Sequence, residues 1–85
     1  MDVFIGKEIV IDLESLFVIL GRLQDIGEKT LALKNADVHD LRDSTTTREA
    51  YIREAGLHGI QPNRKAVHVR LDKVVSVSLL SDVIV

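Results

Sequence analysis

The sequence predicts a mainly all-β fold, in which five antiparallel strands form one strongly bent barrel and a long loop carries one short helix. Apolar and polar residues alternate in several segments, which is the pattern of half-buried strands. Most apolar residues are Val, Ile and Leu, which favour strands, and only two Phe and one Tyr supply aromatic rings. Tight turns join the first three segments, whereas parallel strands would need longer crossovers.

The chain of 85 residues is expected to form one domain. A domain of this size buries only about 60% of the surface that its unfolded chain exposes, so its core is thin. Small domains usually gain stability from disulfides, metals or partner subunits. Because the sequence contains no cysteine, disulfides and thiolate metal sites are excluded. We therefore expect the chain to be stabilised as an oligomer.

The first two strands are expected at Glu8–Leu13 and Leu16–Ile26, where the alternation is clearest. Gly21, in the middle of the second strand, indicates a sharp bend or a close approach of another backbone. A hairpin turn containing Gly27 leads to a third strand that begins at Thr30. The residues expected to face the core are Ile9, Ile11, Leu13, Ile19, Gly21, Leu23, Leu31 and Leu33.

A short helix is expected at residues 46–57, within an insertion that covers about residues 43–64. Thr46 is the candidate N-cap, because Glu49 three residues later completes a capping box. Gly56 or Gly59 is expected to end the helix. The helix either covers the barrel or projects as an arm that binds a partner. In the first case it buries Tyr51, Ile52 and Ala55.

The end of the chain predicts two further strands. The alternation from Ala66 lasts for about 15 residues, which is long for one strand, so we expect a bend or bulge near Asp72 and Lys73. A turn at residues 79–82 is then expected to precede a short fifth strand at residues 83–85.

This layout resembles the Sm/Lsm family, the small β-barrels that include bacterial Hfq. Gly21 and Leu23 match the G-x-L of the family's first motif, and Leu31 and Leu33 match the L-x-L pair that follows. The segment VVSVSLLSDVIV, residues 74–85, resembles the second motif. The match covers most of the chain outside residues 43–64.

The resemblance implies a homomeric ring, in which the fourth strand of one subunit pairs with the fifth strand of the next. An apolar strand edge that is left uncovered is a liability, and head-to-tail pairing that closes on itself covers every edge. The residues expected at this edge are Val75, Val77, Leu79, Val83, Ile84 and Val85.

The resemblance also implies a binding site for single-stranded RNA in two loops. In the family, bases stack on a side chain of the loop between strands two and three, and they hydrogen-bond to an Asn. The stacking position falls at Glu28 or Lys29 and the Asn position at Thr30. The Arg-Gly-Asp turn before the last strand falls on the residues Leu80, Ser81 and Asp82.

The charges are spread unevenly along a chain whose formal net charge is −2. That net charge argues against indiscriminate nucleic-acid binding, but residues 48–73 carry six basic and three acidic side chains. This excess indicates either a face for an anionic partner or a soluble loop in which the bases pair with Glu49, Glu54 and Asp72. The candidate basic face consists of Arg48, Arg53, Arg64, Lys65, Arg70 and Lys73.

Catalytic and metal-binding patterns are not found in the sequence. His39, His58 and His68 lie in three different expected elements without a metal-ligand spacing, and no nucleophile has a base at a motif spacing. We expect no cofactor, no metal and no enzymatic activity. No secretory signal or membrane span is recognised, so we expect a soluble, cytoplasmic protein.

Three interpretations therefore remain open. The chain is an Sm-like ring protein that binds single-stranded RNA or serves as a scaffold in RNA metabolism. Alternatively, it is a structural or protein-interaction ring without RNA binding. The third interpretation is a barrel of another lineage, SH3-like or OB-like.

Overall fold

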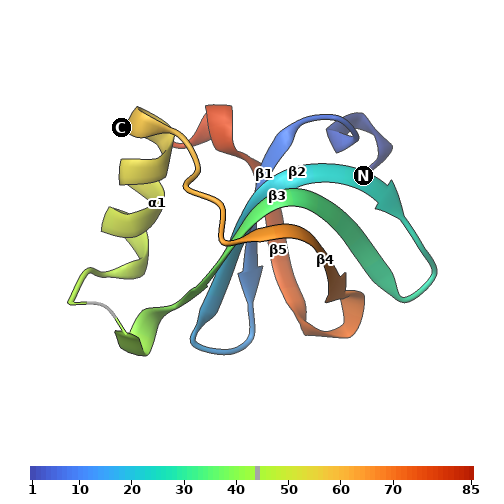
Figure 1. The fold of residues 1–85 in the computed structure, drawn as a ribbon, viewed down its shortest axis with the longest axis horizontal. Coiled ribbons are helices and arrows are strands. Elements are labelled where there is room, and N and C mark those ends of the chain that lie inside the picture. Colours follow the sequence, from blue (N-terminus) through green and yellow to red (C-terminus); the bar gives the residue numbers. More distant parts are fainter. Residues whose placement is uncertain (44) are drawn as a thin grey trace.

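The computed structural model describes residues 1–43 and 45–85. This part of the chain contains five strands and one α-helix (Figure 1). Their bounds are β1 Glu8–Leu13, β2 Phe17–Ile26, β3 Thr30–Asp40, α1 Arg48–His58, β4 Arg64–Arg70 and β5 Val74–Leu79. Single 3-10 turns lie at η1 Asp2–Phe4, η2 Leu41–Asp43, η3 Leu71–Lys73 and η4 Leu80–Asp82.

The strands form one antiparallel sheet in the order β4-β3-β2-β1-β5. The long strands β2 and β3 curve strongly, so the sheet wraps around its own inner face (Figure 1). β4 pairs with β3 and β5 pairs with β1, and no ladder between β4 and β5 is formed in the described residues. The predicted bent, five-stranded, mainly β architecture is confirmed, and the sheet keeps two free edges.

Gly21 permits the bend in β2. A Cβ atom at this position would lie 2.9 Å from Leu33 Cδ2 and 3.1 Å from Ala36 Cβ. The pairing of β2 with β3 also shifts register between Leu20 and Arg22. Any larger residue would push β3 away, so the predicted close backbone approach at Gly21 is confirmed.

The main core lies inside the curve of the sheet. It contains the predicted inward residues of the first three strands, with Leu13 only partly buried. Its buried members are Ile9, Ile11, Ile19, Leu23, Leu31, Leu33, Ala36 and Val69.

A second buried cluster lies between the opposite face of the sheet and α1. Val10 and Leu20 alternate with the residues that face the main core, yet they too are buried, because the helix covers them and leaves them 1% and 0% exposed. Ile52 and Ala55 of α1 are buried in this cluster. The helix therefore packs on the sheet and does not project as an arm.

The ends of α1 differ partly from expectation. The N-cap is Thr47, whose side-chain oxygen accepts a hydrogen bond from the backbone N–H of Ala50 at 3.2 Å. The predicted cap at Thr46 is therefore wrong by one residue. Gly59 ends the helix with φ +90°, a conformation that favours glycine, and its N–H donates to the carbonyl of Ala55. Of the two predicted ends, Gly59 is confirmed.

The end of the chain departs most from the prediction. The expected 15-residue strand is divided by η3, which carries the chain from one sheet edge to the other. The bend lies where it was predicted, near Asp72 and Lys73, but a closing strand at residues 83–85 is wrong, because β5 precedes η4. Those apolar residues instead lie beside the helix, where Val85 is the nearest neighbour of Gly56.

Val75 also departs from the predicted alternation. The pairing of β1 with β5 passes from Asp12↔Ser76 to Leu13↔Val74, so Val75 has no partner in the ladder. Such a bulge reverses the side on which the next residue points. Val75 is consequently 67% exposed, and Val74 packs against the core instead.

Candidate nucleic-acid interface

A pocket opens where the β2–β3 turn meets η3, the connection between β4 and β5. Figure 1 shows these two turns at the end of the molecule opposite α1. The pocket has a volume of about 690 Å³. Its lining residues are Glu28, Lys29, Thr30, Arg70, Leu71 and Asp72.

Backbone hydrogen bonds fix the two turns against each other. The β3–β4 ladder begins with the pair Thr30↔Arg70, and the N–H of Leu71 donates to the carbonyl of Lys29 at 2.9 Å. Within the first turn, the N–H of Gly27 donates to the carbonyl of Thr30 at 2.8 Å. The pocket is therefore built on the rigid ends of strands and not on long loops.

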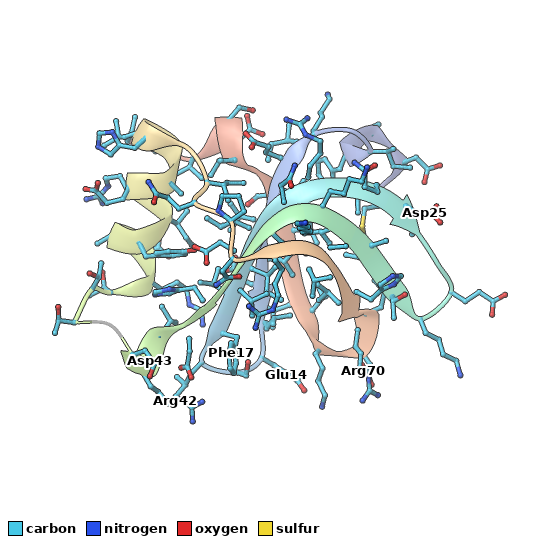
Figure 2. The ribbon with its side chains drawn as sticks, in the orientation of Figure 1. Glu14, Phe17, Asp25, Arg42, Asp43 and Arg70 are labelled. Atoms are coloured by element: carbon cyan, nitrogen blue, oxygen red, sulfur yellow. The ribbon has the colours of Figure 1, made fainter. Side chains whose placement is uncertain are left out.

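The pocket carries two acidic and two basic side chains. Arg70 Nη2 and Asp72 Oδ2 are 2.7 Å apart, with both side chains more than half exposed. Figure 2 shows the Arg70 side chain extending away from the sheet at the end of β4. Glu28 and Lys29 are exposed, and their side chains form no ion pair or hydrogen bond with the described residues. The formal charges of the two acidic and two basic side chains cancel. The pocket therefore offers both hydrogen-bond donors and acceptors without a net charge.

The hydroxyl of Thr30 gives the pocket a further polar group. Its Oγ1 lies 3.5 Å from Nδ1 of His68, the neighbouring exposed residue on β4. A hydroxyl both donates and accepts hydrogen bonds, so Thr30 is free to orient toward either kind of ligand atom.

The predicted loop residues are only partly brought together. Glu28, Lys29 and Thr30 line the pocket together. Residues 80–82, the positions expected for the family's second loop, do not line this pocket: they form η4, which contacts β1 and α1. Leu80 is buried against the helix.

Residues 70–72 occupy the place that the prediction gave to residues 80–82. Their sequence Arg-Leu-Asp keeps the Arg and the Asp of an Arg-Gly-Asp turn and precedes the apolar strand β5. An Arg and an Asp two residues apart, directly before an apolar strand, were the sequence signal for this turn. It was missed because Leu71 continues the apolar alternation of β4, which hides the turn.

The six candidate basic residues do not line one pocket. Arg48 pairs with Asp12 at 3.1 Å, and Lys73 pairs with Glu14 at 3.2 Å. Only Asp72 of the three expected acidic partners forms an ion pair with one of these bases, Arg70. The remaining members are distributed over two other pockets, one lined by Arg53 and one lined by Arg64 and Lys65.

The six predicted edge residues also separate into two groups. Val75, Val77 and Leu79 lie on β5, an outer strand of the sheet. Residues 83–85 lie outside any strand, with Ile84 91% exposed. The second free edge is β4.

A polar cluster that sequence reasoning missed attaches α1 to β3. The hydroxyl of Tyr51 donates to a carboxylate oxygen of Asp37, and Asn63 Nδ2 donates to the other oxygen at 3.0 Å. The His39 ring stacks on Tyr51 with centroids 3.9 Å apart. Burial, together with the bond to Asp37, raises the pKa of Tyr51 well above its ordinary value. This cluster holds the helix in place at a distance from the pocket.

Two other kinds of site are not found among the described residues. Among them, no group of three or more His, Asp or Glu side chains is placed to hold a metal ion. Likewise, none of their helices has the length and apolar character needed to cross a membrane.

Comparison with known proteins gives a match by structure only. No family model matches the sequence, and no curated protein matches it. The structure resembles that of an Sm protein from Pyrococcus abyssii, solved in complex with a uridine heptamer, with a TM-score of 0.62. The match covers 92% of this chain and 89% of that chain at 16% sequence identity. This chain has the Sm fold.

The Sm fold accounts for the free edges and for the place of the pocket. The five-stranded order leaves β4 and β5 unpaired with each other, and η3 joins these two edge strands. The pocket therefore lies beside the connection between the two free edges of the sheet.

Proposed function

We propose that the chain is a subunit of a homomeric Sm-like ring and binds single-stranded RNA in the pocket between the β2–β3 turn and η3. The observation that carries this proposal is the juxtaposition of Glu28–Thr30 with Arg70–Asp72 in one pocket of an Sm fold. The structural neighbour with this fold was solved with a uridine heptamer, and its ligand class is the one proposed here.

Ring formation is supported by the two free sheet edges. β4 and β5 both expose backbone N–H and C=O groups along one side, and such edges pair readily with another strand. β5 also exposes Val75, which is 67% accessible. Pairing of β5 in one copy with β4 in the next covers both edges, and repeated head-to-tail contacts close into a ring.

The ring is tested by native mass spectrometry or light scattering at working concentration. Val75→Lys places a charge on the β5 edge without changing the core, and we expect it to weaken assembly. Leu57→Lys is the matched control, because Leu57 is a similarly exposed apolar residue on α1, away from both edges. A wild-type monomer, or equal loss of assembly in both variants, contradicts the proposed ring.

RNA binding is tested with labelled uridine and adenosine heptamers at low and high salt. Arg70→Ala removes a guanidinium from the pocket and should weaken binding, since this group donates hydrogen bonds that RNA atoms can accept. Arg53→Ala is the matched control, because this arginine lines a different pocket. Equal weakening by the two variants contradicts the assignment of the pocket.

A ring without RNA binding is the second candidate function. Two observations favour it: the pocket contains no aromatic ring on which a base stacks, and its formal charges cancel. Failure of both heptamers to bind even at low salt would establish this alternative.

A further inference from the structure

We infer that the pocket between the β2–β3 turn and η3 selects guanine over uracil. This inference rests on the proposed RNA binding and adds the class of base that the pocket takes. It follows from the side chains that line the pocket, which differ in hydrogen-bonding character from a site built to pair with uracil.

The pocket contains acceptor oxygens that are not used within the protein. Glu28 is exposed and has no partner among the described residues, so both of its carboxylate oxygens are free to accept. Asp72 uses Oδ2 to bind Arg70, which leaves Oδ1. An ionised carboxylate accepts hydrogen bonds and donates none. The ligand edge that fits must therefore donate.

The pocket also contains donor groups. Lys29 carries an unpaired ammonium group on the same turn as Glu28, and Arg70 carries a guanidinium with nitrogen atoms beyond the one that binds Asp72. Thr30 adds a hydroxyl that fits either partner. The resemblance to the Sm family places an Asn at this last position, and Asn presents a fixed donor and acceptor side by side.

The edges of the bases decide between the ligands. Guanine presents the adjacent donors N1–H and N2–H₂ on its Watson–Crick edge, which match the two oxygens of one carboxylate. Its acceptors O6 and N7 are the preferred partners of Arg and Lys. Uracil presents one N–H between two carbonyl oxygens, so a carboxylate facing that edge meets one donor and two repelling acceptors. Protein sites that read single-stranded RNA use these same edges.

Because the charges of the pocket balance, its affinity for RNA depends more strongly on the identity of the base. Glu28 and Asp72 repel phosphate as much as Lys29 and Arg70 attract it, so phosphate attraction contributes little in this pocket. Hydrogen bonds to the base edge then account for a larger part of the affinity than in a basic groove.

The test compares three RNA heptamers that differ only at the second, fourth and sixth positions, which carry uridine, guanosine or inosine. Inosine keeps N1–H, O6 and N7 but lacks the 2-amino group, so it removes one of the two donors that face the carboxylate. We expect the guanosine heptamer to bind about tenfold more tightly than the uridine heptamer, and inosine to lose most of that gain. Isolated guanosines avoid the guanine runs that form quadruplexes.

Glu28→Gln tests the residue that carries the inference. The amide has one acceptor oxygen where the carboxylate has two, and its NH2 group donates, so it cannot face both guanine donors side by side. The preference for guanosine over uridine should therefore fall to about twofold or less. Glu8→Gln removes the same charge from an exposed carboxylate that lines a different pocket, and it should leave the preference unchanged. The ratio of the two affinities is the readout, because a general charge effect moves both affinities together.

The outcomes separate the inference from the function on which it rests. Uridine binding as tightly as guanosine overturns the inference and leaves RNA binding intact. A guanosine preference that survives Glu28→Gln also overturns it. If none of the three heptamers binds at low salt, both the proposed function and the inference fail.

Discussion

Replacing Ile52 with alanine tests whether α1 is part of the folded core. Ile52 lies in the second cluster with Val10 and Leu20, and it is only 6% exposed. Truncation of a buried Ile to Ala costs about 2–5 kcal/mol, from lost transfer free energy and from the cavity that remains. Alanine recovers a few tenths of a kcal/mol of helix propensity, and the helix can settle partly into the gap. We therefore expect a loss of about 3 kcal/mol in the free energy of unfolding.

That loss is large for a domain of this size. Whole domains are stable by only about 5–15 kcal/mol, and each kcal/mol shifts the Tm of a small domain by about 4–8 °C. The Tm should therefore fall by more than about 10 °C in thermal unfolding followed by circular dichroism. All samples are compared at one protomer concentration, because assembly adds concentration-dependent stability.

Leu57→Ala is the matched control on the same helix. Leu57 is 53% exposed and belongs to neither buried cluster, so its truncation should change stability by no more than about 0.5 kcal/mol. If Ile52→Ala is as stable as Leu57→Ala, α1 is not docked on the sheet, and the reasoning about the second cluster is refuted.

Two further predictions concern the bend and the helix attachment. Gly21→Ala should cost about 1–3 kcal/mol in denaturant unfolding, because its Cβ would lie 2.9 Å from Leu33; wild-type stability contradicts the close approach. The raised pKa of Tyr51 means that its contribution to stability is fully present below about pH 10 and is lost as pH rises toward the folded pKa. The stability difference between wild type and Tyr51→Phe should therefore shrink above pH 10, and a difference that stays constant would show that Tyr51 does not bond Asp37 in its neutral form.

Local pattern was sufficient for the first three strands. Their alternation has period two, and Gly21 marks a position in β2 where another backbone approaches closely. The same rule failed at Val10 and Leu20, because α1 covers them from a distant part of the sequence. A period-two pattern assigns one face to the core, and only tertiary contacts show that both faces are covered.

The last third of the chain was harder to predict, because neither its turn nor its bulge interrupts the alternation of apolar and polar residues. Leu71 keeps the apolar parity of β4 although it begins η3, and the bulge at Val75 reverses the parity of β5. Because of these two features, the turn before the last strand was predicted at residues 80–82, whereas the structure has it at residues 70–72 and η3. Half of the candidate site, Glu28–Thr30, was placed by the family resemblance, and its other half needed the three-dimensional pairing of β3 with β4.

The location of η3 predicts that the candidate pocket is coupled to the proposed assembly. η3 joins the two strands whose outer edges are free, and its Leu71 N–H is bonded to Lys29 on the facing turn. When β4 and β5 pair with neighbouring copies, the two ends of η3 become fixed by added ladders. The ordering of the pocket is then completed before RNA arrives, which lowers the entropic cost of binding. A ring also presents several pockets to one strand, which raises the effective concentration.

We therefore expect RNA affinity and assembly to fall together in the edge variant but not in the pocket variant. Val75→Lys should weaken heptamer binding although Val75 does not line the pocket, and raising the protein concentration should restore both properties in parallel. Arg70→Ala should lose affinity while its native mass stays that of the wild-type ring. A monomeric Val75→Lys variant that binds the heptamer with wild-type affinity would refute the coupling, since each subunit would then carry a complete site of its own.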